Sequence, residues 1–513
     1  MANKHANLDS LFNDIADAIR EKIGDESIIP AVDFPDLIRD RLQVTPPKPY
    51  LIFKSPNSFT LAVNDTTKHW DGTLEYSTNA STWTAWDGTT TLSSSTSGSD
   101  NVLYLRGTGN TKITGSSFNY KWVLTGNNIK CIGNIENLLD YATVIAGNHP
   151  TMANYCYNSM FQSCTSLIQA PALPATTLAY NCYSNMFKGC TSLTQAPALP
   201  ATTLASECYN GMFWSCTALS QAPALPATTL ADNCYSDMFR GCTALTQAPE
   251  LPATTLSDNC YYGMFDSCTS LIQAPALPAT TLAYNCYYGM FYGCTSLTQA
   301  PALPATTLTE NCYSGMFQGC TSLTQAPEIL AITMADYCCN LMFYGCTSLT
   351  QAPALPATTL AQSCYASMFR NCTSLTKAPA LPATTLSNNC YAYMFTDCTS
   401  LTQAPALPAI TLAQSCYHGM FWGCISITQA PELPATILAD YCYNDMFNGC
   451  TGLKLSTIYT GEYTQEYRIP TSGNGTIATN ALTDMFTSTG GTFTGTPSIN
   501  TTYYLSNTNT VVS

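Results

Sequence analysis

Charged residues are scarce in this chain. Only 10% of its 513 residues are Asp, Glu, Lys or Arg, against about 25% in an average soluble domain. The few charges are mostly acidic, so the formal net charge is -14. A surface of that sign repels the phosphate backbone of nucleic acids. The composition therefore excludes a basic nucleic-acid-binding protein and favours neutral partners such as glycans or protein surfaces.

Long hydrophobic runs are absent as well. The first residues lack the continuous apolar core of a secretory signal, and no stretch of about 18 apolar residues follows. We therefore expect a protein that is made in the cytoplasm and does not insert into a membrane. It would reach the outside by a route other than signal-peptide export.

Histidine is rare, with four in the chain, and the cysteines form no Cys-x-x-Cys pair. Metal sites need clusters of such ligands, so we expect neither a metal nor a cofactor. The acidic residues and histidines also lack the spacing of a catalytic pair or of a nucleophile with its base. The sequence therefore predicts a protein that is not an enzyme.

A repeat occupies most of the chain. Met-Phe pairs recur every 26 residues, twelve times from Met160 to Met446, without an insertion or deletion. A fixed period of this length is characteristic of solenoids, in which each unit packs only on its neighbours. We assign the solenoid to residues 156–455 and an N-terminal cap of the array to residues 131–155.

Each unit is predicted to contain one short helix and one short parallel strand. Leu230, Cys234 and Met238 stand at i, i+4 and i+8, which is the spacing of a helix. The residue before the second Cys is Gly, Asn, Asp or Ser, and most of these accept the left-handed conformation that ends helices. Residues 192–196 then favour a strand that Pro197 closes. The expected fold class is an α/β repeat solenoid.

Two cysteines per unit follow the repeat, which accounts for 24 of the 26 in the chain. They recur in phase with Leu, Met and Phe, so we expect buried free thiols. Disulfides between neighbouring units are an alternative on distance alone, but they need a specific geometry and cytoplasmic synthesis disfavours them.

Three columns of the repeat vary freely: the residue after Met-Phe, the residue after Cys-Tyr, and the one that follows it, which holds Asp237, Leu341 and Tyr393. They carry aromatic and charged side chains among small polar ones, a mixture that suits contacts with sugars or proteins. Neutral drift on a solvated helix face is the alternative reading. The candidate ligand-binding residues are Lys188, Trp214, Arg240, Tyr262, Tyr288, Tyr292, Tyr344, Arg370, His418 and Trp422.

Three further segments flank the array. Residues 1–45 predict a helical attachment segment whose apolar stripe needs a partner. Residues 46–130 alternate with period two and predict a small antiparallel β domain, with its tryptophans mainly in the core and a glycan platform as the alternative. Residues 456–513 form a C-terminal cap and tail. The residues expected to attach the chain are Leu8, Leu11, Phe12, Ile15, Ile19 and Phe34.

The repeat unit itself points to a family. Its sequence Met-Phe-x-Gly-Cys-Thr-Ser-Leu-Thr-Gln-Ala-Pro-Ala-Leu-Pro resembles the BspA-like leucine-rich repeats of bacterial surface proteins, over roughly residues 131–455. The 26-residue period is longer than the usual unit of that family. The resemblance implies a leucine-rich-repeat-like solenoid that serves as an adhesin or binding scaffold.

The first 45 residues are similar to the helical segment that opens many bacteriophage tail and baseplate-associated proteins. The similarity lies in the Leu-Phe-x-x-Ile-Ala-x-Ala-Ile-Arg pattern of residues 11–20 and in the Phe34-Pro35 pair. It implies a structural tail protein of the virion, fibre or baseplate-associated. Such a protein would bind other tail proteins through residues 1–45 and a host-surface glycan or protein through the array.

The alternative is a bacterial BspA-like adhesin displayed on the cell surface. The sequence does not fix the number of subunits, and a homo-oligomer stays open.

Overall fold

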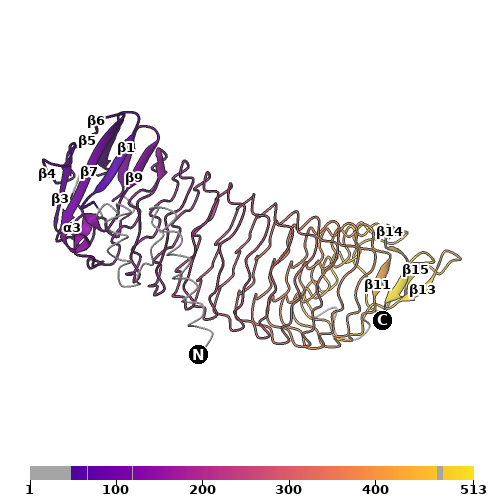
Figure 1. Cartoon of the computed structure of the whole chain (residues 1–513). Coiled ribbons are helices and arrows are strands. Elements are labelled where there is room, and N and C mark those ends of the chain that lie inside the picture. The colour runs from indigo at the N-terminus through magenta and orange to yellow at the C-terminus, as the bar shows by residue number, and fades with distance from the viewer. Residues whose placement is uncertain (1–47, 66–67, 118–119, 471–477, 513) are drawn as a thin grey trace, which may run out of the picture.

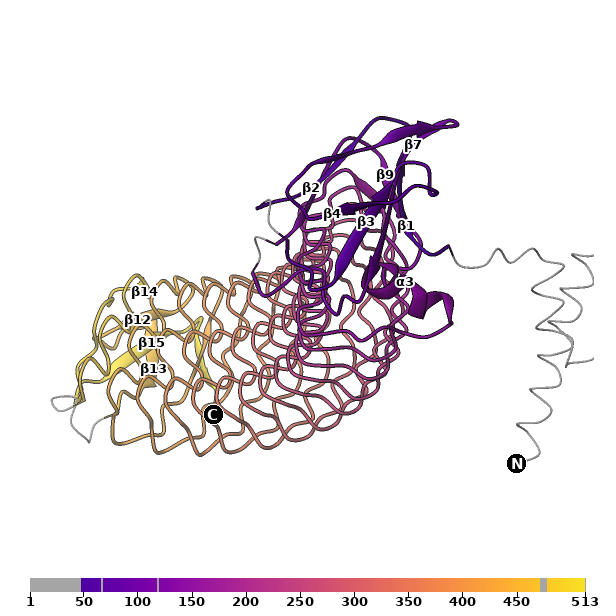
Figure 2. The same cartoon turned by 90° about the vertical axis from the view of Figure 1, so that its left-hand side faces the viewer.

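The computed structural model describes residues 48–65, 68–117, 120–470 and 478–512. It is an elongated stack of coils, with a β domain at one end and a small sheet at the other (Figure 1). A view turned by 90° shows that the stack curves along its length (Figure 2). We call each 26-residue unit a coil. The predicted attachment residues lie outside the described residues; they are Leu8, Leu11, Phe12, Ile15, Ile19 and Phe34.

The β domain consists of two sheets. Burial alternates along β1 (Leu51–Ser55), so Leu51 and Phe53 lie in the core between the two sheets. Trp70, Trp86 and Trp122 are buried in the same core. One sheet contains β1 (Leu51–Ser55), β3 (Thr73–Ser77), β4 (Thr84–Trp86), β6 (Ser95–Ser97), β7 (Asp100–Thr108) and β9 (Ile129–Ile132). The other has the order β5 (Leu92–Ser93), β2 (Thr60–Val63), β8 (Trp122–Thr125).

The array grows directly from the first of these sheets. Strand β9 pairs in parallel with β10 (Leu167–Gln169), which belongs to the first coil. Between them lies α3 (Asn137–Ile145), the single helix in the described part of the chain. A Cβ on Gly107 of β7 would lie 1.7 Å from the carbonyl oxygen of Leu138. Glycine at this position therefore lets α3 pack directly on the sheet.

The coils contain turns where the sequence predicted helices. The N–H of Met238 donates to the carbonyl of Tyr235, three residues earlier, at 3.3 Å, whereas the N–H of Phe239 donates to the carbonyl of Met264 in the next coil at 2.9 Å. This alternation holds along the whole segment, so every second N–H joins neighbouring coils. A helix would keep these hydrogen bonds within one coil, so the helix prediction was wrong for the units.

Left-handed residues explain why the chain turns in this way. In the same coil, Asn233, Asp237 and Gly241 have φ values of 54°, 52° and 70°. They are four residues apart, and each opens a new turn. The four-residue period of these turns is close to the 3.6-residue period of an α-helix. The two structures therefore bury side chains at almost the same spacing, and the apolar pattern alone does not separate them.

The predicted strands are also shorter than expected. Strands appear in the first coil, as β10, and in a late coil, as β11 (Gln429–Pro431). Between them the parallel register is kept by isolated bridges, such as Gln247 with Gln273 and Gln273 with Gln299. A second series joins threonines, such as Thr229 with Thr255. The prolines that follow each Gln have no N–H to donate, which cuts the ladder short.

The core of the array consists of columns of identical side chains. The rings of Phe161 and Phe187 stack at 5.7 Å with an interplanar angle of 6°, and the column continues to Phe447 and Phe486 at 5.7 Å. The second cysteine of each coil donates to a backbone carbonyl of the preceding coil, as from Cys190 Sγ to Phe161 at 3.0 Å. All 26 cysteines are buried free thiols, as the phase of the repeat predicts.

The C-terminal residues close the other end of the stack. Residues 478–487 form one more coil, since the N–H of Phe447 donates to the carbonyl of Met485 at 2.9 Å. A last strand, β16 (Thr510–Val512), pairs in parallel with β11 and covers its edge. The sheet beside it has the order β13 (Tyr463–Tyr467), β15 (Tyr503–Ser506), β12 (Lys454–Ser456), β14 (Gly490–Gly491).

Candidate ligand-binding face

The turns give every coil an outer face. In each four-residue turn, the Cys-Tyr or Met-Phe pair is buried in the core, whereas the next two residues range from buried, as in Ser236 and Thr396, to exposed, as in Tyr292. We call the surface made by the exposed and partly buried ones in successive coils the turn face. All ten candidate ligand-binding residues belong to it. Tyr292 and Trp422 are the most exposed of them, at 43% and 42%, and the other eight are partly buried.

A cationic and aromatic cluster occupies the N-terminal part of the turn face. Lys188 Nζ lies 3.4 Å from the ring centroid of Trp214, and the guanidinium of Arg240 lies 4.8 Å from the same ring. Arg240 is also paired with two carboxylates, Asp266 at 3.1 Å and Asp237 at 3.4 Å. Burial lowers the pKa of Lys188. Both cations therefore already have partners within the protein.

Tyrosines occupy the middle of the turn face. The rings of Tyr262 and Tyr288 stack at 4.9 Å with an interplanar angle of 2°. Burial, and next the neighbouring Tyr288, raise the pKa of Tyr262, so the phenol of Tyr262 is neutral at pH 7. Tyr292 lies in the coil of Tyr288 and is exposed. This part of the face offers flat, uncharged aromatic surface.

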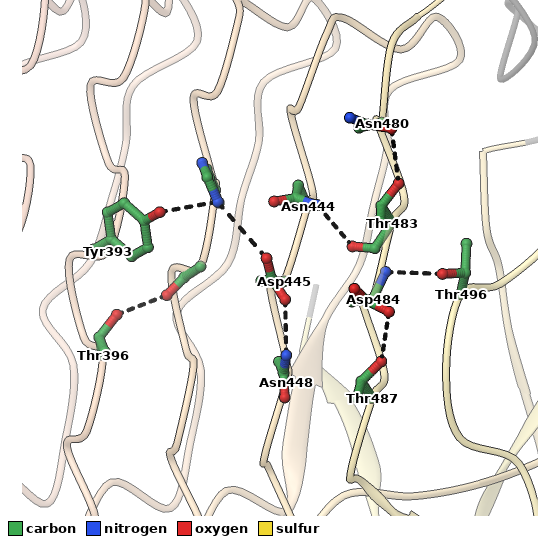
Figure 3. Close-up of polar contacts among 12 residues, drawn as sticks. Tyr393, Thr396, Asn444, Asp445, Asn448, Asn480, Thr483, Asp484, Thr487 and Thr496 are labelled. Carbon is green, nitrogen blue, oxygen red and sulfur yellow. Dashed lines mark hydrogen bonds and ion pairs between the residues drawn. The ribbon is translucent and has the colours of Figure 1, made fainter.

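A second polar cluster lies toward the C-terminal end. The hydroxyl of Tyr393 is 3.0 Å from Nε2 of His418, and the same nitrogen is 3.8 Å from a carboxylate oxygen of Asp445. Asp445 in turn accepts a hydrogen bond from Asn448 at 2.7 Å, as Figure 3 shows. Burial lowers the pKa of His418, although Asp445 opposes the shift. Three successive coils thus share one chain of polar contacts.

Steric matching between neighbouring coils positions this cluster. Tyr393 is left-handed, with φ 56°, and its ring lies across Gly419 of the next coil, where a Cβ would come within 2.6 Å of the ring. Asp237 lies across Gly263 in the same way, with 2.6 Å to the carboxylate. The sequence suggested free variation in this column. Its signal for constraint was the glycine that stands 26 residues after each of these side chains.

The array sequence matches a described family. That family, "BspA type Leucine rich repeat region (6 copies)", matches residues 154–289, 256–402 and 336–454, which together make up more than half of the chain. The chain belongs to the BspA-type leucine-rich repeat family.

Among solved structures, the chain is similar to one titled "Crystal structure of TLR13-ssRNA13 complex". The identity is 13%, the TM-score is 0.22, and the match covers 61% of this chain and 44% of that chain. The chain thus spans less than half the length of that protein. No curated protein matches.

BspA-type repeats point to a surface or adhesin-type protein. The array of this chain has two different sides. Opposite the turn face, neighbouring coils enclose shallow hollows between their Pro-rich segments. One hollow, of about 570 Å³, is lined by residues 350–356 and 376–382, and another, of about 550 Å³, by residues 247–252 and 273–278. Their linings are nearly the same from coil to coil. The residues of the turn face differ from coil to coil, so this side can distinguish one ligand from another.

The β domain adds an aromatic cluster that the sequence did not separate from the core. Trp70, Trp86 and Trp122 are buried, as expected. Trp83 instead lies at the surface, with the guanidinium of Arg106 at 4.1 Å from its ring centroid. Strand β4 ends the sheet, which leaves Trp83 beside an uncovered edge.

The described part of the BspA-type chain holds no group of three or more His, Cys, Asp or Glu side chains that could bind a metal ion. Its one helix, α3, is too short to cross a membrane.

Proposed function

We propose that this chain is a non-enzymatic binding protein displayed on a surface, and that its turn face recognises a cell-surface glycan or protein. The observation that carries the proposal is the contrast between the two layers of each coil. The core columns repeat the same side chains, whereas aromatic and charged residues vary from coil to coil on the turn face. A rigid support with variable contacts is the arrangement expected of a recognition scaffold.

Glycans suit this face better than extended apolar partners. Tyr292 and Trp422 present exposed rings on the turn face, among small and polar side chains. Aromatic rings pack on the apolar faces of sugars, while carboxylates accept hydrogen bonds from sugar hydroxyls and amides both donate and accept them.

The test is a variant that carries Trp214→Ala, Tyr292→Ala, Tyr344→Ala and Trp422→Ala. We expect it to lose binding to a glycan array and to intact target cells. The matched control carries Thr176→Ala, Thr254→Ala, Thr306→Ala and Thr384→Ala, which alter exposed residues of the opposite side. Unchanged binding by the first variant, folded as judged by circular dichroism, would exclude the turn face.

A bacteriophage tail is the more specific setting that we propose for this activity. The support is the sequence of residues 1–45, which resembles the opening segment of tail and baseplate-associated proteins. In this setting that segment binds other tail proteins and the array reaches the host surface. The second setting, favoured by the family of the repeats, is the surface of a bacterial cell.

Antibodies against residues 156–455 distinguish the two settings. Immunogold labelling of tails on particles released by lysis supports the phage assignment, and deletion of residues 1–45 should abolish the label. Labelling of the intact cell envelope instead supports the bacterial adhesin.

A further inference from the structure

We propose that Arg370, between Tyr344 and Tyr393, forms a subsite for the carboxylate of an acidic sugar. The proposal rests on the glycan-binding function of the turn face and names the chemistry that one part of it selects. The three residues come from three successive coils. The guanidinium carbon of Arg370 lies 5.7 Å from the ring centroid of Tyr344 and 5.8 Å from that of Tyr393.

Arg370 differs from the other arginine in the same column. Arg240 is paired with Asp266 and Asp237 at 3.1 and 3.4 Å. Arg370 forms no ion pair with any described residue, and its buried Nε has no hydrogen-bond partner. A guanidinium always carries its charge and its five N–H donors. Arg370 therefore carries a positive charge that no described carboxylate neutralises.

An anion with two oxygens satisfies these donors. Carboxylates bind guanidinium groups through two parallel hydrogen bonds, and such charge-assisted bonds are about twice as strong as neutral ones. Nε is buried and out of reach of a ligand. The carboxylate therefore meets the two terminal amino groups of the guanidinium, which donate to no described residue.

The surroundings favour a sugar as the carrier of that carboxylate. Tyr344 and Tyr393 offer ring surface on both sides of the charge, and the amide of Asn371 lies 3.4 Å from the Tyr344 hydroxyl. Exposed Trp422 lies two coils further on. A polyacidic partner would be repelled, because the chain carries a net charge of -14. A glycan with one acidic residue meets the site with little of that repulsion.

The experiment compares three probes on the full-length protein. They are the disaccharide glucuronyl-β-1,4-glucose, its methyl ester, and the blocked peptide N-acetyl-Gly-Glu-Gly-amide. Affinities are measured by calorimetry and by saturation-transfer NMR. We expect the acid to bind about tenfold tighter than the ester, as one charge-assisted contact provides, and the peptide to bind no tighter than the ester.

Variants assign this preference to Arg370. Arg370→Gln should remove the tenfold difference between acid and ester, and Arg370→Lys should retain part of it. Arg106→Gln is the matched control, since that guanidinium lies in the β domain, outside the turn face, and is paired with Glu75 at 2.8 Å; it should keep the full preference.

Three outcomes would overturn the subsite: equal binding of acid and ester by the wild-type protein, an equal loss in Arg106→Gln, or peptide binding as tight as that of the acid. If glycan-array binding through Tyr292 and Trp422 persists in these cases, only the subsite fails. If the protein binds no glycan at all, the proposed function fails with it.

Discussion

At the scale of single residues, the stacked tyrosines combine favourable packing with a polar cost. Their rings fill the core from coil to coil, but the hydroxyls of Tyr183, Tyr235, Tyr287 and Tyr417 are buried without a hydrogen-bond partner. The first tyrosine of the column is different, because the hydroxyl of Tyr157 donates to the carbonyl of Ile135 at 3.2 Å. The same side chain therefore contributes differently at two positions in one column.

Removing these hydroxyls should have opposite effects. Tyr235→Phe should raise the free energy of unfolding by about 1 kcal/mol, because it eliminates an unsatisfied buried group. Tyr157→Phe, the matched control, should lower it by about the same amount, because the carbonyl of Ile135 loses its donor. Urea denaturation followed by circular dichroism measures both, and equal effects of the two substitutions would contradict the assignment.

His418 should make stability depend on pH. Tyr393, Asp445 and Tyr441 face its ring, and burial lowers its pKa below the ordinary value of 6.5. The unfolded chain therefore binds a proton at a higher pH than the native protein does. The contribution of neutral His418 is fully present above about pH 6.5 and is lost as the pH falls below it.

The measurement is the melting temperature between pH 7.5 and 5. The melting temperature of the wild-type protein should fall further on acidification than that of His418→Gln. Parallel curves for the two proteins would show that His418 has no part in the pH dependence.

The cysteines should be chemically inert. Burial raises the pKa of Cys216 and Cys346 to about 12, and the thiolate is the form that reacts. We expect no reaction of the native protein with a thiol-specific disulfide reagent at pH 8, and reaction of 26 thiols after denaturation. Rapid labelling of the native protein would contradict the burial of the two cysteine columns.

At the scale of the structural element, the sequence identified the right periodicity and the wrong hydrogen bonds. The apolar columns, the phase of the cysteines and the left-handed residue before the second Cys, such as Gly241, could all be predicted. The residues at Asn233 and Asp237 have the same preference for left-handed conformation. Three such columns four residues apart indicate successive turns, whereas one indicates only the end of a helix.

Gly419 tests the steric matching between coils. Gly419→Ala should destabilise the protein by about 1–2 kcal/mol more than Gly289→Ala. Both glycines are left-handed, with φ near 55°, but a Cβ on Gly419 meets the Tyr393 ring at 2.6 Å, whereas one on Gly289 has its nearest neighbour at 3.9 Å. Tyr393→Ala should recover most of the difference in the double mutant. No recovery would assign the cost to backbone strain alone.

At the scale of the whole molecule, the fixed 26-residue period predicted a solenoid. The candidate face was predicted because three columns vary while the rest do not. The contacts across coils were not predictable, since Arg240 and Arg370 occupy the same column and only the structure shows which of them is paired. Those contacts depend on which residues adjacent coils happen to carry, and no single unit contains that information.

Deletion of one whole unit should be tolerated. Removal of residues 286–311 joins Asn285 to Cys312 and leaves a regular array of eleven Met-Phe units. We expect an unchanged circular dichroism spectrum per residue and a slightly lower melting temperature. Removal of residues 286–310 leaves one extra residue in a turn and should lower the melting temperature far more. Equal stability of the two deletions would refute register-dependent stacking.

In the turn segments, the backbone hydrogen bonds between coils run in one direction, from an N–H to the carbonyl of the following coil. This layer of the array therefore has chemically distinct ends, one rich in acceptors and one rich in donors, like a filament with a plus and a minus end. The β domain occupies the acceptors, as where the N–H of Trp122 donates to Met160 at 2.7 Å. At the opposite end, the N–H of Phe486 donates to the carbonyl of Gly495 at 3.0 Å. A chain stripped of both terminal regions would be free to polymerise head to tail.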